Sequence, residues 1–468
     1  MNQRKNKRFL FLYKRISTKV LRRILVVSIL TCVELNAYSQ GQSSKDTIPY
    51  LNLDQCIAYA LQHQPGVLLS QINISIAQKT NEINLSGWLP QVYLAGSLTH
   101  YNQLATSLQP NPANPDGPPI PVKGGVYNTA TPQLDASETI LSPGLLYSAN
   151  SAHLIVQQAQ QANDSSKIGV VSTVSKAFYN LLLTFEQINV FKEDTARLTK
   201  NLRDAYHQYE GGIVDKTDYE EAAITLNNSK AQLRQATENV RPQYYYLKQI
   251  IGFPVEQNFN INFDTAQMMH EVLIDTTQKF QFENRIEYQL LETQKNLQQE
   301  ITNYYRYQFL PTLSANFSYI YDFESNSFSN LFSQAYPYSY EGLSISIPLF
   351  TGFSRLENIQ KSKLQTQLLD IDEYNLKAGI YTQYTTALAN YKSNLYNLTV
   401  LKDNVSMAKD TYGVVSLQYK QGIVTYLNVI TAESNLIASE ISYINALFQV
   451  MQSKVDLQKA MGIIPVKH

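Results

Sequence analysis

The sequence predicts a mostly α-helical protein that also contributes strands to a membrane β-barrel. It is expected to form two structural repeats, each with long coiled-coil helices and a β-hairpin. Three observations lead to this prediction: short motifs recur at constant offsets, proline is missing from long stretches, and segments of alternating polar and apolar residues interrupt those stretches. Proline costs about 3 kcal/mol inside a helix, so its absence marks candidate helices. Alternation with a period of two is typical of strands.

Composition excludes several classes of protein. The 468 residues carry 38 basic and 38 acidic side chains, so the formal net charge of zero gives no electrostatic footprint for nucleic acid. Charged residues make up 16% of the chain, below the roughly 25% of an ordinary soluble domain. Two cysteines, Cys32 and Cys56, are too few for a disulfide scaffold or a structural zinc site.

Residues 1–39 are expected to be a signal peptide. A basic segment without acidic residues precedes an apolar core over 24–33, which is too short to span a bilayer. Small residues at Ala37 and Ser39 place cleavage after residue 39, and the alternative is a cytoplasmic protein with a basic tail. Without this segment the chain has 38 − 9 = 29 basic and 38 − 1 = 37 acidic residues, a charge of about −8.

Two parts of the chain resemble each other. Leu-Pro at 89–90 recurs at 310–311, an offset of 221, and Tyr-x-x-Gly-Ile-Val at 209–214 recurs at 419–424, an offset of 210. Constant spacing between matching motifs indicates an internal repeat. The same offsets relate two further pairs, His63 with Asn284 and Gly252 with Gly462. The expected parts are a first repeat over 51–254, a connector over 255–283 and a second repeat over 284–464.

The expected helices are long. A helix opens each repeat, and the four that follow the strands are expected over 144–210, 214–250, 352–421 and 423–462. Apolar residues recur within them at helical or heptad spacing, as at Leu226, Leu233 and Val240. A helix of about 67 residues reaches roughly 100 Å at 1.5 Å per residue, which no compact globule needs. No later stretch has 18 consecutive apolar residues, so we expect no transmembrane helix, and membrane entry would require a barrel.

Strands are expected between those helices, at about 90–101, 126–141, 311–322 and 338–349. Leu313, Ala315 and Phe317 alternate with polar residues over a length of about ten, which matches membrane-barrel strands, although each strand alone also suits a soluble sheet. The strand expected at 126–141 has the weakest alternation, because the charged Glu138 falls at a position where the pattern calls for an apolar residue. The proline-rich loop over 109–121 would cover a pore mouth or act as a stiff spacer.

Tyrosines cluster at one end of the second hairpin, where we expect an interfacial aromatic girdle. They are Tyr319, Tyr321, Tyr336, Tyr338 and Tyr340. Four strands cannot close a barrel, because the smallest membrane barrels use about eight. Several copies of the chain must therefore associate or leave costly open edges in lipid.

The order and spacing of these motifs resemble the TolC family, the outer-membrane channel components of tripartite efflux and type I secretion systems. The resemblance covers residues 51–464. It rests on both Leu-Pro motifs, Asn-Arg-Ile-Glu at 284–287, Ile-Pro-Leu-Phe-Thr-Gly at 347–352 and both Tyr-x-x-Gly-Ile-Val motifs. It implies a homotrimer whose 12-stranded barrel, with four strands per copy, stands on a long α-helical barrel with an equatorial region near the connector. The implied location is the outer membrane, with the helices in the periplasm. The implied partners are a periplasmic adaptor, an inner-membrane pump and outer-membrane lipid.

The resemblance also implies roles for residues at the helical tips. Gly212 and Gly422 would turn one helix into the next at the periplasmic end, since glycine readily adopts positive φ. These turns would expose an apolar pair in each repeat to the adaptor, and the alternative is a helix–helix turn without a partner. The exposed pairs would be Ile213 with Val214 and Ile423 with Val424.

A second set of residues matches the family's entrance. Asp218 and Tyr419 correspond to members of the hydrogen-bond network that holds neighbouring coils closed, so we expect a hydrogen bond between them. Val424 stands where the family has an arginine, so the bond would lack charge assistance. Such a bond is worth about 1 kcal/mol, against about 1.5–3 kcal/mol when a charge takes part.

The family's cation-binding ring of aspartates is not expected here. Asn428 and Thr431 occupy the matching positions of the second repeat, whereas the first repeat has Asp218 and Glu221. In a trimer Glu221 would either form an acidic ring around the axis or be a solvated surface residue.

No motif points to an enzyme. The sequence lacks His-Glu-x-x-His, Gly-x-x-x-x-Gly-Lys-Ser/Thr and Gly-x-Ser-x-Gly, and its six histidines are scattered without ligand spacing. We therefore expect no catalytic residue, no metal and no cofactor. The expected function is that of a passive trimeric exit duct driven by a partner pump. The alternative is a non-conducting periplasmic or surface helical protein with a structural or adhesive role.

Overall fold

The computed structural model describes residues 50–262 and 272–465. The described residues of Leu51–Gln257 and Ile261–His468 form one compact unit, and Tyr50 with Asn258–Asn260 belong to another. The predicted signal peptide over 1–39 lies outside the described residues, and the connector over 255–283 is described only in part.

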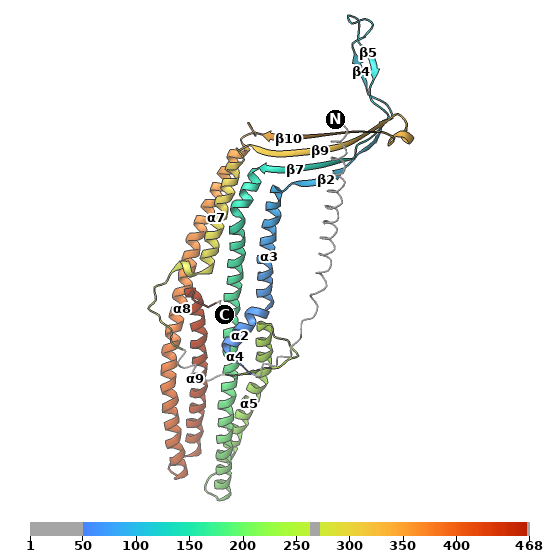
Figure 1. The fold of residues 1–468 in the computed structure, drawn as a ribbon. Helices are drawn as coiled ribbons and strands as arrows, with labels where there is room; N and C mark the ends of the chain where they lie inside the picture. Colours follow the sequence, from blue (N-terminus) through green and yellow to red (C-terminus); the bar gives the residue numbers. More distant parts are fainter. Residues whose placement is uncertain (1–49, 263–271, 466–468) are drawn as a thin grey trace, which may run out of the picture. The chain divides into compact units, whose positions relative to one another are not determined.

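Helices dominate the described chain (Figure 1). They are α2 (Leu53–His63), α3 (Pro65–Leu85), α4 (Pro143–Glu210), α5 (Lys216–Ile251), α7 (Ile286–Tyr307), α8 (Ser354–Lys420) and α9 (Tyr426–Met461), with short 3-10 turns at Ser86–Trp88, Phe282–Asn284 and Phe328–Asn330. The long helices α4 and α8 contain 68 and 67 residues, and the helix after each contains 36. Each repeat therefore supplies one long and one half-length helix.

Three helix boundaries differ from expectation for local reasons. The helix that opens the first repeat is divided in two, because α3 begins with Pro65, which is tolerated in the first turn of a helix but not in its interior. Helices α5 and α9 begin later than predicted, because the residues before them, Asp215 and Thr425, have extended backbones.

The strands form one main sheet and two small ones. The main sheet contains β2 (Gln91–Ala95), β3 (Leu98–His100), β6 (Asn128–Ala130), β7 (Gln133–Leu141), β9 (Thr312–Ser325) and β10 (Ala335–Ser346), and the small sheets pair β1 (Tyr50–Leu51) with β8 (Asn260–Ile261) and β4 (Thr106–Gln109) with β5 (Ile120–Lys123). The proline-rich loop over 109–121 is thus mainly the connection of an additional β4–β5 hairpin that the sequence did not predict.

All pairings in the main sheet are antiparallel, in the order β2–β7–β9–β10 (Figure 1), and β3 and β6 extend the first two strands. The first hairpin is interrupted around Gly96 in one strand and Pro132 in the other, and Pro132 has no N–H for the ladder. In the described part of the chain, β2 and β10 each have a hydrogen-bonded neighbour on one side only. The sheet therefore ends in two open edges.

Strand register assigns each side chain to one of two faces, because residues directly opposite each other project to the same side. One face is mostly apolar and includes Val92, Leu94, Leu134, Ala315, Phe317 and Ile345. The other is mostly polar and includes Gln91, Gln133, Asp135, Asn316, Ser318 and Ser344. The hydrogen bond from Ser318 Oγ to Asp135 Oδ1, 2.6 Å long, confirms that two of the polar residues share a face.

The prediction of one tyrosine girdle is wrong. Tyr319 and Tyr321 lie on the apolar face, whereas Tyr336, Tyr338 and Tyr340 lie opposite Asp322, Ile320 and Ser318 on the polar face. The cause is register: shifting a strand by one residue exchanges its two faces, and the turn between β9 and β10 sets that shift.

Helix α4 lies at the centre of the helical part, because it packs against α3, α5, α7 and α9. Fully buried side chains of α4, α5 and α9 include Leu181, Leu182, Leu247, Val450 and Leu457. Among the described helices only α4 has an 18-residue window apolar enough to cross a membrane, and 56% of that window is buried inside the protein. The window is thus largely a core segment.

The two repeats share a backbone contact at equivalent glycines. Gly252 and Gly462 have φ angles of 73° and 72°. A Cβ atom on Gly252 would lie 2.6 Å from the carbonyl oxygen of His63, and one on Gly462 would lie 2.4 Å from that of Asn284. The constant offsets in the sequence relate Gly252 with Gly462 and His63 with Asn284. Equivalent residues of the two repeats therefore make the same glycine–carbonyl contact.

Candidate functional site

The turns at the helical tips have the geometry expected of their glycines. Gly212 and Gly422 have φ angles of 68° and 72°, in the left-handed region. In both turns the amide of the glycine donates to the carbonyl three residues earlier, and the next amide donates to the carbonyl five residues earlier, all at 2.9 Å. This is the Schellman motif, which satisfies carbonyl groups at the end of a helix. The predicted positive φ values are confirmed.

Exposure of the four apolar tip residues is uneven. Ile213 and Ile423 are 76% and 65% exposed. Val214 and Val424 are only half-buried, so the expectation that both members of each pair are exposed is wrong for the valines. Both valines line a cavity between the tips, together with Ile213.

This tip cavity has a volume of ≈ 580 Å³. It lies between the α4–α5 turn and the α8–α9 turn, and its lining includes Gln208, Val214, Asp218, Tyr419 and Val424. The structure therefore brings Asp218 and Tyr419, which lie 201 positions apart, to one cavity.

The expected bond between those two residues is not the one that forms. The Tyr419 hydroxyl donates to Gln208 Oε1 at 2.5 Å, so the link runs from α8 to α4. Burial, and then the charges of Asp218 and Asp204, raise the pKa of Tyr419 to about 12, which keeps the phenol protonated as a donor. Gln208 was missed because the motif match pointed to an aspartate, and nothing in the sequence singles out this glutamine.

The other predicted entrance residues lie near the starts of α5 and α9. Glu221 is half-buried on α5, three residues after Asp218. Burial, and then the charges of Glu221 and Asp215, raise the pKa of Asp218. Asn428 and Thr431 are exposed on α9, and the Thr431 hydroxyl donates to the backbone of its own helix. The first tip is therefore acidic and the second is neutral at matching positions.

Polar bonds tie α4 to the helices of the second repeat along much of its length. From the tip toward the sheet they join Gln208 to Tyr419, Asn201 to Tyr412 and Glu433, Arg197 to Glu433, Gln187 to Asn445, Asn180 to Gln452, and Lys176 to Asp456. We call these contacts the polar ladder. Each neutral bond contributes about 1 kcal/mol, so the ladder holds the two helical hairpins together through many small contributions.

A buried charged cluster forms the centre of the polar ladder. Arg197 donates to Asp194 on its own helix and, at 3.0 Å, to Glu433 Oε1 on α9. Asp194 and Glu433 are 0% exposed. The second carboxylate oxygen of Asp194 has no hydrogen-bond partner in the described part of the chain. Burial is the largest influence on Asp194 and raises its pKa to about 7, although Arg197 opposes this.

The raised pKa of Asp194 predicts a pH-dependent stability. The unfolded group has a pKa of about 3.9, so between about pH 4 and pH 7 the folded protein binds more protons than the unfolded chain. The contribution of Asp194 is fully present below pH 4 and is lost as pH rises to about 7. We expect Asp194→Asn to flatten this decline when thermal denaturation is followed by circular dichroism across that range.

The groups facing Asp194 are Arg197 on α4 and Glu433 and Glu440 on α9. Burial also raises the pKa values of Glu433 and Glu440, so some slope in the same direction remains in the variant. An Asp194→Asn protein with the unchanged pH slope would contradict the assignment.

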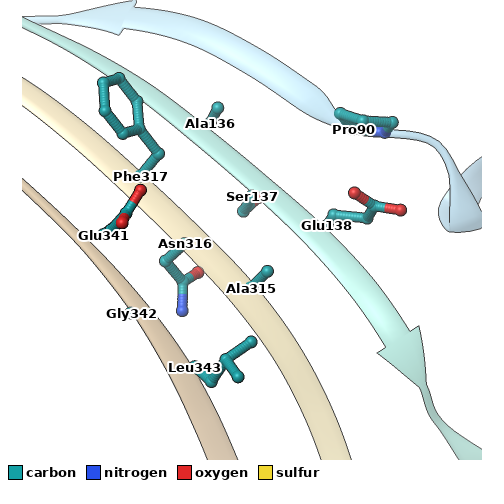
Figure 2. Close-up of a pocket in the computed structure, with 10 residues that line it drawn as sticks. All are labelled: Pro90, Ala136, Ser137, Glu138, Ala315, Asn316, Phe317, Glu341, Gly342 and Leu343. Carbon is teal, nitrogen blue, oxygen red and sulfur yellow. The ribbon is translucent and has the colours of Figure 1, made fainter.

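The apolar face of the sheet carries a shallow hollow of ≈ 520 Å³ (Figure 2). Glu138 on β7 and Glu341 on β10 both line it. They lie opposite Ala315 and Phe317, respectively, so both belong to the apolar face. For Glu138 this agrees with the alternation of polar and apolar residues in the sequence. Glu138 is three residues from the end of β7 that leads to α4, whereas Glu341 lies near the middle of β10.

Comparison with known proteins gives a consistent result. The model of the family described as outer membrane efflux protein matches residues 56–253 and 287–463. The curated relatives include a probable efflux pump outer membrane protein, TtgC, and an antibiotic efflux pump outer membrane protein, ArpC, both of Pseudomonas putida. Each is 22% identical over 318 residues, or 65% of this chain. The chain matches 62% of the length of these relatives, which is less than two thirds.

Solved structures share the fold. The outer membrane protein VceC of Vibrio cholerae superposes with a TM-score of 0.69 at 16% identity, covering 88% of this chain and 96% of that one. The MtrE outer membrane channel of Neisseria gonorrhoeae, in its open state, gives a TM-score of 0.68 at 17% identity, covering 88% of each chain.

Proposed function

We propose, from the premise that this chain belongs to the outer membrane efflux protein family, that it is a passive homotrimeric exit duct of the outer membrane. In this proposal the helices extend into the periplasm, a periplasmic adaptor binds their tips, and an inner-membrane pump supplies the energy. The observation that carries the proposal is the sheet, which has one apolar face and two open edges and is joined to long paired helices.

The open edges favour association of several copies. In lipid, each backbone N–H or C=O group without a partner costs several kcal/mol. Pairing β10 of one copy with β2 of the next would satisfy both edges. Three copies with four strands each would give a twelve-stranded barrel, within the size range of membrane barrels.

The two glutamates on the apolar face bear differently on such a barrel. A charged residue on the lipid-facing side costs most at the bilayer midplane and little near the interface, and acids cost less than bases. Glu138 is three residues from the end of β7 that leads to α4, where the proposed barrel would meet the periplasmic interface, whereas Glu341 lies near the middle of β10 and would carry the larger cost in lipid.

We assign the tips to adaptor binding and entrance control. The proposed adaptor-binding residues are Gly212, Ile213, Val214, Gly422, Ile423 and Val424, with the two exposed isoleucines as principal contacts. The proposed entrance residues are Asp218, Glu221, Tyr419, Asn428 and Thr431, together with Gln208.

Oligomeric state and conductance test the function. The purified mature protein in detergent is expected to form heat-modifiable trimers and to produce discrete current steps in planar bilayers. A non-conducting helical protein of the periplasm or cell surface would produce no steps. A stable, water-soluble monomer without detergent would overturn the proposal.

The Tyr419–Gln208 bond gives a more specific prediction. Tyr419→Phe removes the donor, and a neutral hydrogen bond corresponds to about a twofold to tenfold change in an equilibrium. We therefore expect the ratio of open to closed time in single-channel recordings to rise by that factor. Gln208→Ala, which removes the acceptor, should raise the ratio of open to closed time by a similar factor. Asp218→Ala should raise that ratio by a smaller factor. Unchanged gating in both Tyr419→Phe and Gln208→Ala would reject this entrance assignment.

A further inference from the structure

The polar face of the main sheet carries aromatic and acidic side chains in neighbouring rows. Strand register places Tyr93, Asp135, Ser318 and Tyr340 in one row across β2, β7, β9 and β10. The next row toward the hairpin turn ends in Tyr338. Tyr93, Tyr338 and Tyr340 are 53%, 51% and 57% exposed in one protomer, so their rings are accessible on this face.

Charge on the main sheet has a single sign. Its six strands, all of them described, contain acidic residues and neither lysine nor arginine. On the polar face the acids are Asp135, Asp322 and Glu324. Asp135 accepts hydrogen bonds from the neutral side chains of Ser318 and Gln133, at 2.6 and 2.7 Å, which orient the carboxylate without neutralising it.

The two edges of the sheet both end in tyrosine on this face. Tyr93 is on β2 and Tyr340 is on β10, the strands with an open side. If copies close a barrel through these edges, as the proposed function requires, each seam carries a tyrosine of this face on both of its strands. Closure staggers neighbouring copies along the strands, so each copy supplies its own row of two tyrosines and one carboxylate to the lumen.

We infer that this row, Tyr93, Asp135 and Tyr340 with Tyr338 beside it, forms a cation-binding wall inside the barrel that favours organic ammonium ions. The inference rests on the proposed function and adds a substrate class to it. An ammonium group is attracted to the face of an aromatic ring within about 6 Å of its centroid, and quaternary ammonium ions suit such rings well. The carboxylates on the polar face of the main sheet add a negative potential that attracts cations and repels anions.

Reversal potentials across a KCl gradient test the charge. The gradient should stay at or below about 0.1 M, where the screening length is about 10 Å. The unmodified trimer is expected to prefer K⁺ over Cl⁻, and Asp135→Asn is expected to lower that preference about twofold, because it removes one carboxylate from every copy. Glu138→Gln is the matched control, since Glu138 lies three residues away on the same strand but on the opposite face.

Permeability of tetramethylammonium relative to K⁺ tests the aromatic rings. Tyr340→Leu is expected to lower that ratio about twofold to fivefold, the factor that one exposed cation–π contact represents. Tyr340→Phe keeps the ring and should keep the ratio. Tyr319→Leu, on the apolar face of β9, is the control that changes an aromatic residue outside the wall.

The outcomes separate this inference from the proposed function. Absence of any conductance would reject the exit duct itself. Trimers that conduct but show equal effects for Asp135→Asn and Glu138→Gln, or for Tyr340→Leu and Tyr340→Phe, would reject the cation-binding wall alone.

Discussion

Arg197→Ala is expected to destabilise the helical part of the protein by about 3–5 kcal/mol, the range for removing one partner of a buried ion pair. In the described part of the chain, Arg197 is the only basic residue that bonds to Asp194 and Glu433. Both carboxylates are fully buried, so the variant leaves two acids facing each other without a counter-charge. Thermal denaturation followed by circular dichroism measures the loss.

The control for this prediction removes all the charges together. Arg197→Met combined with Asp194→Asn and Glu433→Gln replaces the ions by neutral groups of similar size, which is often close to neutral for stability. We expect this triple variant to recover most of the stability lost in Arg197→Ala. If Arg197→Ala melts at the same temperature as the unmodified protein, the buried cluster does not stabilise the hairpin contact.

Gly462→Ala is expected to have an effect of similar size through the backbone. A non-glycine residue in the left-handed region costs about 1–2 kcal/mol, and overpacking adds about 1–3 kcal/mol. The new Cβ would lie 2.4 Å from the carbonyl oxygen of Asn284, a backbone atom that cannot rotate away. Thermal denaturation followed by circular dichroism should show a clear fall in melting temperature.

Gly169→Ala is the matched control for the glycine prediction. Gly169 lies within α4, and a Cβ there would have no atom within 4 Å of it. Alanine inside a helix is about 0.5–1 kcal/mol more favourable than glycine, so this variant should be slightly more stable. Gly252→Ala should resemble Gly462→Ala, because Gly252 meets His63 in the same way. Equal behaviour of Gly462→Ala and Gly169→Ala would contradict the argument.

The sequence predicted the features that depend on backbone chemistry. Proline-free stretches located α4 and α8 within two residues of their observed starts, because proline is costly inside a helix, although α5 accommodates Pro242 in its interior. The two tip glycines were found from the recurrence of Tyr-x-x-Gly-Ile-Val at an offset of 210 and from the family resemblance, and their positive φ follows because a left-handed turn strongly favours glycine. The proline signal is local and needs no knowledge of the neighbouring elements.

Features that depend on contacts between distant segments were not predictable. The faces of β10 depend on a register that one turn shifts by a single residue, so the sequence did not show that the five tyrosines of the expected girdle divide between the two faces of the sheet. Gln208 and Arg197 are ordinary polar residues of a helix in sequence, and only the packing of α4 against α8 and α9 gives them partners.

The matched lengths of the two helical hairpins make their turns quasi-equivalent. Helices α4 and α8 differ by one residue, and α5 and α9 are equally long. If a protein docks on the tips as proposed, it meets the same Gly-Ile-Val backbone geometry twice per chain, followed in one case by Asp215 and in the other by Thr425. A protein that treats both turns alike must recognise their shared shape, and one that distinguishes them must read the carboxylates. Interchanging these short segments between the turns would redirect a discriminating binder while a shape-reading one would be unaffected.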